Sequence, residues 1–376
     1  MIGVSYDADQ AAMDRDMLRA RSWRYAPAAD LRVSDAASRL AQGYHRLRNR
    51  LGRLRSACGW PDPAALGYAV GSLSKAALRE NADLTILHLE PALWAGTRLI
   101  RRGMRIGVDI EDWYSENRPA GPAARRESRY LRGLEQRILR AAAYATCPSR
   151  AMAEALSKAY QVPLPEVVYN SVPSLRKTVP VAPGGPLRLV WFSQTIGPGR
   201  GLEDLFPALT HLHGDWMLEL RGKSTPEVRK WVKSQVPEPL RVRVFIEPSV
   251  SPDALSNAVS RSDVGLVLDP PWCRNKDLTI SNKILQYLQA GLSVAAAETS
   301  GVREVRAALP GAVSTYPAGR SRALAYLLNG FLKDRAALAA RRDALQAAAN
   351  AKFAYEHQMP QVQSSLERAL RGEWRT

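Results

Sequence analysis

The chain has 376 residues, which suits about two domains, and its 46% apolar and 24% charged residues exclude wholesale disorder and fibrous structure. Lys and Arg (53) outnumber Asp and Glu (36), so the net charge is +17; residues 1–173 contribute +8 and residues 174–376 contribute +9. The excess is therefore not a basic tail, and its field favours polyanions such as nucleic acid, anionic lipid or phosphorylated substrates.

The three cysteines, Cys58, Cys147 and Cys273, form no CxxC pair. This excludes a disulfide scaffold and a zinc ribbon and suits a reducing compartment. The N-terminus has no basic region followed by an apolar run, and no stretch of about 18 apolar residues occurs. We therefore expect a cytoplasmic protein.

Short apolar runs alternate with longer helical patterns along the chain. This alternation predicts an α/β fold in which parallel sheets are covered by helices on both faces, as in doubly wound Rossmann-like domains. The predicted strands are 84–88, 105–110, 144–147, 166–169, 187–192, 216–221, 242–246, 264–268 and 292–297. The predicted helices are 36–57, 66–80, 126–141, 150–159, 201–212, 225–234, 252–261, 281–290 and 320–347.

The segment 36–61 contains no acidic residue. In a helix its apolar side chains share one face and its arginines crowd the rest; the apolar set is Leu40, Tyr44, Leu47, Leu51, Leu54 and Cys58. This pattern is typical of a helix that lies on an anionic membrane surface, and residues 36–58 are the predicted contact. The same stripe would equally pack on the sheet of the first domain, and the sequence leaves both interpretations open.

A break falls near the middle of the chain. Residues 171–186 carry four Pro and two Gly with no periodic apolar pattern, which indicates an interdomain linker. We expect an N-terminal domain over 1–173, a linker over 174–186 and a second domain over 187–350. The last segment, 351–376, is predicted to be a helix that packs back on the N-terminal domain.

The loop 192–201, FSQTIGPGRG, stands between a predicted strand and a predicted helix. Glycines allow backbone N–H groups to approach an anion, and a helix start adds positive potential, although Gly-Pro-Gly also forms simple turns. In this loop Arg200 would supply a cation and Gln194 a neutral donor.

The segment 275–291, NKDLTISNKILQYLQAG, reads as a helix with Ser281 as N-cap and Gly291 as C-cap. Lys283 lies in its first turn, where a cation opposes the helix dipole. A bound diphosphate would resolve that conflict; a solvated lysine is the alternative.

The run 281–305, SNKILQYLQAGLSVAAAETSGVREV, resembles the donor-site segment of family-4 (group 1) retaining glycosyltransferases. Six further segments resemble the family in the same order: 82–93, 108–116, 134–156, 167–173, 188–205 and 251–268. The resemblance implies the GT-B fold, in which two Rossmann-like doubly wound domains face a central cleft.

The resemblance also implies that the second domain binds a nucleotide-sugar donor. Arg200 matches the basic residue that contacts the donor phosphates, and Gln194 stands where the family usually has a second Arg or Lys. Gln286 matches a glutamate that binds ribose hydroxyls, and the family's other glutamate falls on Leu278, beside Asp277. The other expected donor contacts are Thr195, Gly197, Thr279, Ile280, Ser281, Asn282 and Lys283.

In the first domain, Glu111 stands where the family commonly has a histidine that touches the donor sugar. Its carboxylate would hydrogen-bond sugar hydroxyls or stabilise positive charge on the anomeric carbon. Asp109, Glu111 and Asp112 are also compatible with a DxD-like metal site or with helix-capping carboxylates. Trp113 would stack on a sugar or pack in the core. His88 ends a strand and is either a cleft residue or a structural one.

The sequence thus predicts a retaining glycosyltransferase, with Glu111 and Arg200 as its catalytic residues, that acts on a glycan or lipid-linked acceptor in bacterial surface polysaccharide synthesis. We expect no metal, no cofactor and no nucleic-acid partner, and a protein that is cytoplasmic or peripheral on the inner face of the cell membrane. A non-catalytic GT-B partner protein and a GT-B-fold sugar-nucleotide epimerase or hydrolase remain alternatives. A nucleic-acid binder, suggested by the charge of +17, lacks a recognition motif.

Overall fold

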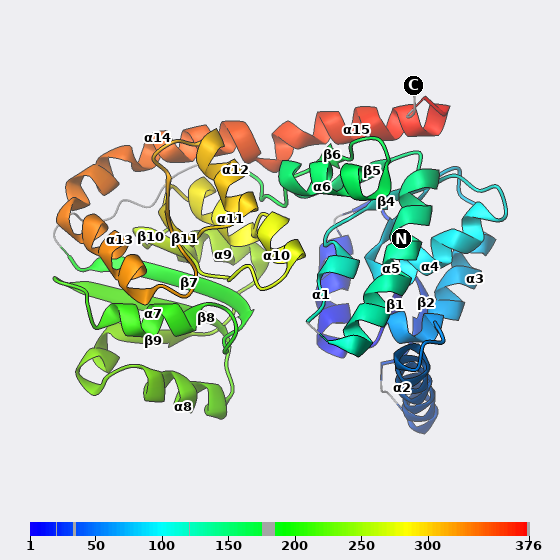
Figure 1. Ribbon diagram of the computed structural model, residues 1–376, viewed down its shortest axis with the longest axis horizontal. Coiled ribbons are helices and arrows are strands. Elements are labelled where there is room, and N and C mark those ends of the chain that lie inside the picture. Colours follow the sequence, from blue (N-terminus) through cyan, green and yellow to red (C-terminus); the bar gives the residue numbers. More distant parts are fainter. Residues whose placement is uncertain (20, 33–34, 120, 175–184, 374–376) are drawn as a thin grey trace. The chain divides into compact units, whose positions relative to one another are not determined.

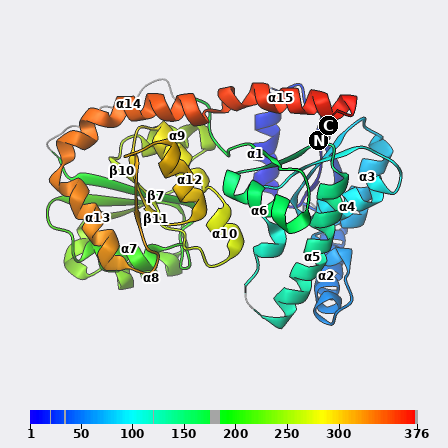
Figure 2. The same ribbon diagram turned by 45° about the horizontal axis from the view of Figure 1, so that its top comes forward.

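The computed structural model describes residues 1–19, 21–32, 35–119, 121–174 and 185–373 (Figures 1 and 2). The chain forms two compact units. Unit 1 comprises Met1–Cys147, Ala153–Glu166 and Ser364–Thr376, and unit 2 comprises Pro148–Met152 and Val167–Gln363. Most of the predicted linker lies outside the described residues.

Unit 1 contains two sheets. The first pairs β1 (Ile2–Ser5) with β2 (Ala26–Asp30) in parallel. The second has the order β3-β4-β5-β6, and its β3–β4 and β4–β5 pairs are parallel. Its strands are β3 (Thr85–His88), β4 (Ile106–Asp109), β5 (Ala145–Cys147) and β6 (Glu166–Val167).

The helices of unit 1 follow their strands as in a doubly wound fold. They are α1 (Ala8–Arg19), α2 (Ala36–Ala57), α3 (Val70–Glu80), α4 (Leu89–Ile100), α5 (Pro122–Ala141) and α6 (Arg150–Tyr160), with short 3-10 turns η1 (Pro63–Leu66) and η2 (Tyr114–Glu116). Helix α4 packs against α3 and α5, and α5 packs against α2. The α4 helix was missed from the sequence, where only a strand and a loop were expected over 82–93.

Helix α2 uses a polar face, rather than its apolar stripe, to attach to the rest of unit 1. Asn49 is buried and its Nδ2 donates to the Ala64 carbonyl at 2.6 Å. A Cβ at Gly52 would lie 2.8 Å from the Ala65 backbone nitrogen, so only glycine permits this approach to η1. Arg48 donates to both carboxylate oxygens of Asp62, at 2.8 and 3.2 Å.

The apolar stripe of α2 is therefore exposed, which overturns the interpretation that it packs on the sheet. The exposed fractions are 76% for Leu40, 62% for Tyr44, 57% for Leu47, 46% for Leu51 and 57% for Leu54. Among the described residues, no helix combines the length and the apolarity needed to cross a bilayer.

Unit 2 is built on a six-stranded sheet of order β12-β11-β10-β7-β8-β9, in which all pairs are parallel. The strands are β7 (Leu187–Thr195), β8 (Trp216–Lys223), β9 (Val244–Glu247), β10 (Val264–Val267), β11 (Ser293–Ala297) and β12 (Val313–Tyr316). Every residue of β10 and β11 is buried, and so is most of the first half of β7, as expected for a parallel sheet covered on both faces.

Two hydrophobic clusters cover the two faces of this sheet (Figures 1 and 2). One contains α7 (Leu202–Leu209), α8 (Pro226–Gln235) and α13 (Ser321–Lys333). The other contains α9 (Pro252–Val259), α11 (Asn282–Gln289), α12 (Ser300–Ala308) and α14 (Arg335–Phe353). The remaining elements are η3 (Glu238–Arg243), α10 (Arg274–Leu278) and α15 (Tyr355–Arg371), whose last turns belong to unit 1.

The packing between β10 and α11 leaves no room for a side chain at Gly265. A Cβ there would lie 2.2 Å from the ring of Tyr287, which is fully buried and accepts a hydrogen bond from the Phe192 amide at 3.2 Å. We expect Gly265→Ala to lower the free energy of unfolding by about 1–3 kcal/mol, because the ring and the strand must separate.

Chemical denaturation measures this effect. The matched control is Gly330→Ala, in α13, where nothing lies within 4 Å of the added Cβ. That substitution should stabilise the protein by about 0.5–1 kcal/mol, since alanine restricts the unfolded chain. Equal effects at the two positions would contradict the packing argument.

Candidate functional site

The strand order of unit 2 reverses between β7 and β10. From β7 the chain proceeds outward through β8 and β9, and from β10 it proceeds the other way through β11 and β12. In open parallel sheets, ligands bind outside the carboxyl ends of the strands at such a reversal. The loop after β7 and the loop after β10 are therefore the candidate binding edge of unit 2.

The loop after β7 holds the first group of predicted donor residues. Strand β7 continues to Thr195, so Gln194 and Thr195 lie at its exposed end. Arg200 follows, and its Nη1 donates to Ser193 Oγ at 2.9 Å. The Gly199 amide donates to Glu203 Oε1 at 2.5 Å, so this amide already has an anionic partner within the protein.

Gly201 holds the loop after β7 against the end of β10. Its φ is +80°, and a Cβ would lie 1.9 Å from the Leu268 carbonyl oxygen. Only glycine permits both this backbone conformation and this approach. The contact places Arg200 beside the chain segment that continues into Asp269.

Lys283 does not need a bound diphosphate to compensate its position in the first turn of α11. Its Nζ lies 2.6 Å from Asp269 Oδ2 and 5.9 Å from the centre of the Trp191 ring. The residue is 9% exposed. The expected conflict with the helix dipole is therefore resolved inside the protein, by a carboxylate that the sequence interpretation overlooked. The sequence did contain a signal for this carboxylate, because Asp269 directly follows the predicted buried strand 264–268.

The start of α11 differs from the prediction in its details. Ser281 is the N-cap residue, and in the described structure its side chain makes no capping hydrogen bond. The Thr279 amide donates to the Asn275 carbonyl at 2.9 Å, so it is not an available phosphate donor. Ile280 is buried and Asn282 is exposed.

Gln286, the predicted ribose contact, holds two helices together. Its side chain is 6% exposed, and its Nε2 donates to Ser256 Oγ of α9 at 3.3 Å. Leu278, at the position of the family's first glutamate, is buried. The neighbouring Asp277 caps α12 by accepting from the Ser300 amide at 2.9 Å and the Ser300 hydroxyl at 2.7 Å.

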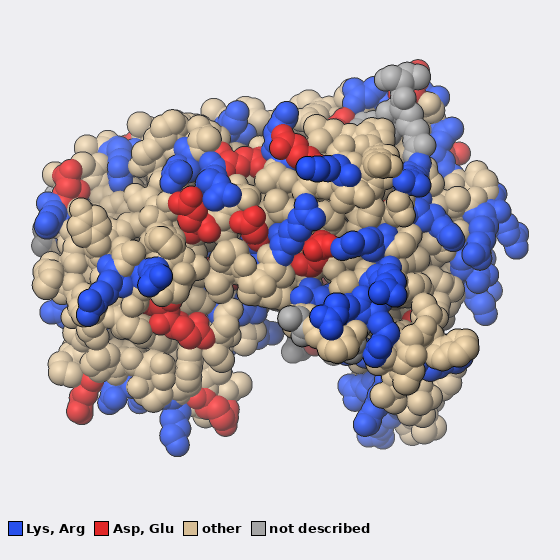
Figure 3. Space-filling view, viewed as in Figure 1, with Lys and Arg blue, Asp and Glu red and all other residues tan. Residues whose placement is uncertain are grey.

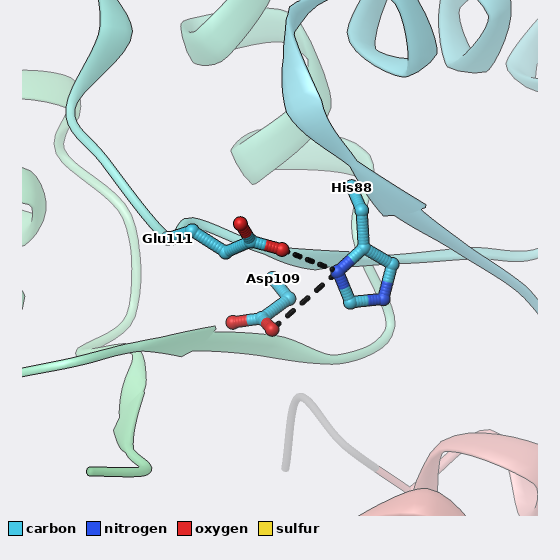
Figure 4. A group of neighbouring side chains, drawn as sticks. All are labelled: His88, Asp109 and Glu111. Atoms are coloured by element: carbon cyan, nitrogen blue, oxygen red, sulfur yellow. Dashed lines mark hydrogen bonds and ion pairs between the residues drawn. The ribbon is translucent and has the colours of Figure 1, made fainter. Parts of the chain in front are cut away.

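Unit 1 brings together a second group of predicted residues at the carboxyl ends of β3 and β4 (Figure 4). His88 and Asp109 are register partners on the two strands. His88 Nδ1 lies 3.1 Å from Glu111 Oε1 and 3.5 Å from Asp109 Oδ2. The hydrogen bond to Glu111 raises the pKa of His88 above its ordinary value, although burial acts in the opposite direction. Asp112, the next residue, is partly buried.

Trp113 lies in the core of unit 1, which corrects the predicted sugar-stacking role. It is 1% exposed, and its Nε1 donates to the Tyr160 hydroxyl at 2.9 Å. That hydroxyl donates to Glu135 Oε2 at 2.6 Å, and Glu135 Oε1 accepts from the Ser115 amide at 2.9 Å. Burial raises the pKa of Glu135, and the network is a structural one.

The chain is similar to known proteins in part of its sequence and in its fold. Residues 25–174 match the family model described as Glycosyltransferase Family 4. No curated protein sequence matches the chain. Among solved structures, Anabaena Alr3699/HepE in complex with UDP is 18% identical with a TM-score of 0.66, and the match covers 97% of this chain and 98% of that one.

Two further structures have the same architecture. Sucrose-phosphate synthase from Thermosynechococcus elongatus is 17% identical with a TM-score of 0.63, over 80% of this chain and 77% of that one. The lipopolysaccharide outer core galactosyltransferase WaaB is 13% identical with a TM-score of 0.56, over 99% and 98%. At these identities the likeness shows the fold, which is GT-B.

The Lys283–Asp269 pair allows a test of the unit 2 edge. We expect Asp269→Asn to lower the free energy of unfolding by about 1.5–3 kcal/mol, because it leaves a buried ammonium group without its counter-charge. Adding Lys283→Met should recover much of that loss, since the unpaired charge is then removed as well. Urea denaturation of the two variants checks this, and additive losses would show that the pair is not coupled.

Proposed function

We propose that this chain, whose residues 25–174 match the model of glycosyltransferase family 4 and whose fold is GT-B, is a retaining glycosyltransferase. It transfers a hexosyl group from a nucleotide-sugar donor to a hydroxyl group of a glycan or lipid-linked acceptor. The observation that carries the proposal is a pair of basic side chains at the strand reversal of unit 2. Arg200 lies on the loop after β7, and Lys283, in the first turn of α11, is paired with Asp269 on the loop after β10.

The donor diphosphate would bind at this edge of unit 2. Arg200 is held only by the neutral hydroxyl of Ser193 among its described contacts, so its charge is not cancelled there. Lys283 shares its charge with Asp269, so it contributes less. Gln194, at the exposed end of β7, supplies neutral donors. In this proposal these groups stabilise the leaving diphosphate, and no metal ion takes part in that contact.

The reaction needs little acid–base chemistry from the protein. The acceptor oxygen bonds to the anomeric carbon on the face from which the diphosphate departs, and the bond between that carbon and the diphosphate breaks. The departing phosphate oxygen takes the acceptor proton. The Glu111 carboxylate contributes by accepting from sugar hydroxyls or by stabilising positive charge on the anomeric carbon. HepE, which has the same fold, has been crystallised with UDP-glucose, and this supports a nucleotide-sugar donor.

Arg200→Ala should weaken binding of the donor nucleotide about ten-fold, because it removes the least compensated cation of the edge. Isothermal titration with UDP, GDP and their sugars measures this and also identifies the base. Arg229→Ala, an exposed arginine on α8, is the matched control and should bind like the wild type. Absence of nucleotide binding, together with tight salt-sensitive DNA binding, would overturn the proposal.

Glu111→Gln should lower turnover by at least ten-fold while leaving nucleotide affinity unchanged, because the residue belongs to unit 1 and carries no diphosphate contact. Release of nucleoside diphosphate, measured with and without acceptor glycans or lipid extracts, gives both quantities. A wild-type protein that binds a nucleotide sugar without turnover on any acceptor would instead be a non-catalytic GT-B partner protein. Release of diphosphate without sugar transfer would indicate a hydrolase or epimerase.

The same proposal includes a role in bacterial surface polysaccharide synthesis at the inner face of the membrane, and helix α2 supports the membrane contact. Five large apolar side chains of this helix are exposed, and the helix carries no acidic residue. Figure 3 shows an uncharged surface over α2 at the lower right, with Lys and Arg beside it. An interfacial helix combines these two properties, because its apolar face enters the bilayer and its cations meet anionic headgroups.

Vesicle sedimentation tests the membrane contact. The protein should bind vesicles that contain phosphatidylglycerol, less so as salt rises, and should not bind pure phosphatidylcholine. Leu47→Asp with Leu51→Asp should lower the bound fraction at least five-fold, whereas Leu164→Asp, an exposed leucine elsewhere in unit 1, should not. Unchanged binding in the double variant would remove α2 from the proposal, and loss of a dimer in that variant would make the stripe an interface between copies.

A further inference from the structure

The ends of β3 and β4 present three side chains whose chemistry is that of a metal site. His88 and Asp109 are side by side in the sheet register, and Glu111 lies two residues beyond β4 (Figure 4). One ligand atom of each, the imidazole nitrogen and a carboxylate oxygen from each acid, lies within 4.8 Å of the other two. Within the described part of the chain, this is the group of His, Cys, Asp and Glu side chains that could hold an ion.

We propose that His88, Asp109 and Glu111 bind a divalent transition-metal ion. Two neighbouring ligands of an octahedral ion, with bonds of about 2.1 Å, are about 3.0 Å apart. His88 Nδ1 is already 3.1 Å from Glu111 Oε1 and 3.5 Å from Asp109 Oδ2. Small side-chain rotations would therefore bring all three atoms onto one ion, which then bridges groups that now contact each other directly.

The mixed ligand set selects among metals. One imidazole nitrogen with two carboxylate oxygens suits Mn²⁺, Fe²⁺, Co²⁺ or Zn²⁺ better than Mg²⁺ or Ca²⁺, which prefer oxygen alone. The two carboxylates also balance the charge of a divalent ion. Three protein ligands on one side of the ion leave its other positions for water or for substrate oxygens.

A buried residue outside this group fixes the orientation of Asp109. Thr146, on β5 and 2% exposed, donates its hydroxyl to Asp109 Oδ1 at 2.7 Å. The other oxygen, Oδ2, is the one directed at His88. Carboxylates that bind metals in proteins are commonly oriented in this way: one oxygen accepts a hydrogen bond from a neighbouring residue, and the other faces the ion. The His88 side chain is 51% exposed, so an ion can enter from solvent.

This inference goes beyond sugar transfer and does not depend on it. Every proposed diphosphate contact belongs to unit 2, so the ion is not assigned to the leaving group. Glu111 has two carboxylate oxygens, and one can bind the ion while the other remains for a sugar hydroxyl. Because ion binding is measured without donor or acceptor, its failure would leave the transferase proposal intact, and the reverse also holds.

The test is isothermal titration of the full-length, chelator-treated protein with MnCl₂, ZnCl₂ and MgCl₂. We expect one Mn²⁺ or Zn²⁺ per chain, with Mg²⁺ binding at least ten-fold more weakly. His88→Ala and Glu111→Gln should each weaken binding at least ten-fold. Thr146→Val should weaken ion binding less than either of these substitutions, because all three ligand side chains remain, as expected for a positioning residue.

Matched controls are His45→Ala and Asp83→Asn, both in unit 1 and outside the group of three, and these should bind the ion like the wild type. The electron paramagnetic resonance spectrum of Mn²⁺ gives a second readout, since the free-ion signal should fall on addition of wild-type protein but not of His88→Ala. A wild-type protein that binds neither Mn²⁺ nor Zn²⁺ would overturn the proposal. So would binding that His88→Ala and Glu111→Gln leave unchanged.

Discussion

A close backbone approach at the edge of unit 2 lies between Gly201 and the Leu268 carbonyl. It joins the loop after β7 to the loop after β10, and a side chain of any size at position 201 would separate them. Arg200 precedes this contact on one loop and Asp269 follows it on the other. Arg200 and the carboxylate that holds Lys283 are therefore set at one edge by a single steric constraint, on which the proposed diphosphate contacts depend.

Charge at this edge is distributed unequally, and the inequality has a chemical consequence. The Asp269 carboxylate lies 2.6 Å from the Lys283 ammonium group, and the Glu203 carboxylate accepts a hydrogen bond from the Gly199 amide. Arg200, in contrast, donates to the neutral hydroxyl of Ser193. A diphosphate bound at this edge would be stabilised most by Arg200, since Lys283 and the Gly199 amide already have anionic partners. We therefore expect donor affinity to depend mainly on Arg200, although the loop after β7 and the start of α11 contain further basic and amide groups.

The sequence could predict those features that depend on local pattern. Continuous apolar runs located β3 to β11, whereas β1, β2 and β12 were not among the predicted strands. Glycine and proline marked the loop that contains Arg200. It could not predict contacts between distant segments. The partner of Lys283 stands fourteen residues earlier on a different loop. Trp113 stands next to an acidic cluster in the sequence, which made contact with a sugar one of its two interpretations. In the structure its ring is buried in the core, where its Nε1 donates to Tyr160, which in turn donates to Glu135. Helix α4 was missed because His88, Glu90 and Pro91 interrupt its apolar pattern at the start.

Helix α2 shows why an amphipathic pattern alone does not determine which side faces the core. The apolar stripe and the acid-free arginine face were evident from the sequence, but both a buried and an exposed stripe were compatible with them. Asn49 and Gly52 decide between the two, because an amide that bonds the Ala64 carbonyl and a missing Cβ let a polar face approach η1 closely. An apolar face left in water by such specific contacts costs free energy unless something covers it. In the proposal made above, an anionic membrane surface is that cover, because the cations around the stripe would meet its headgroups.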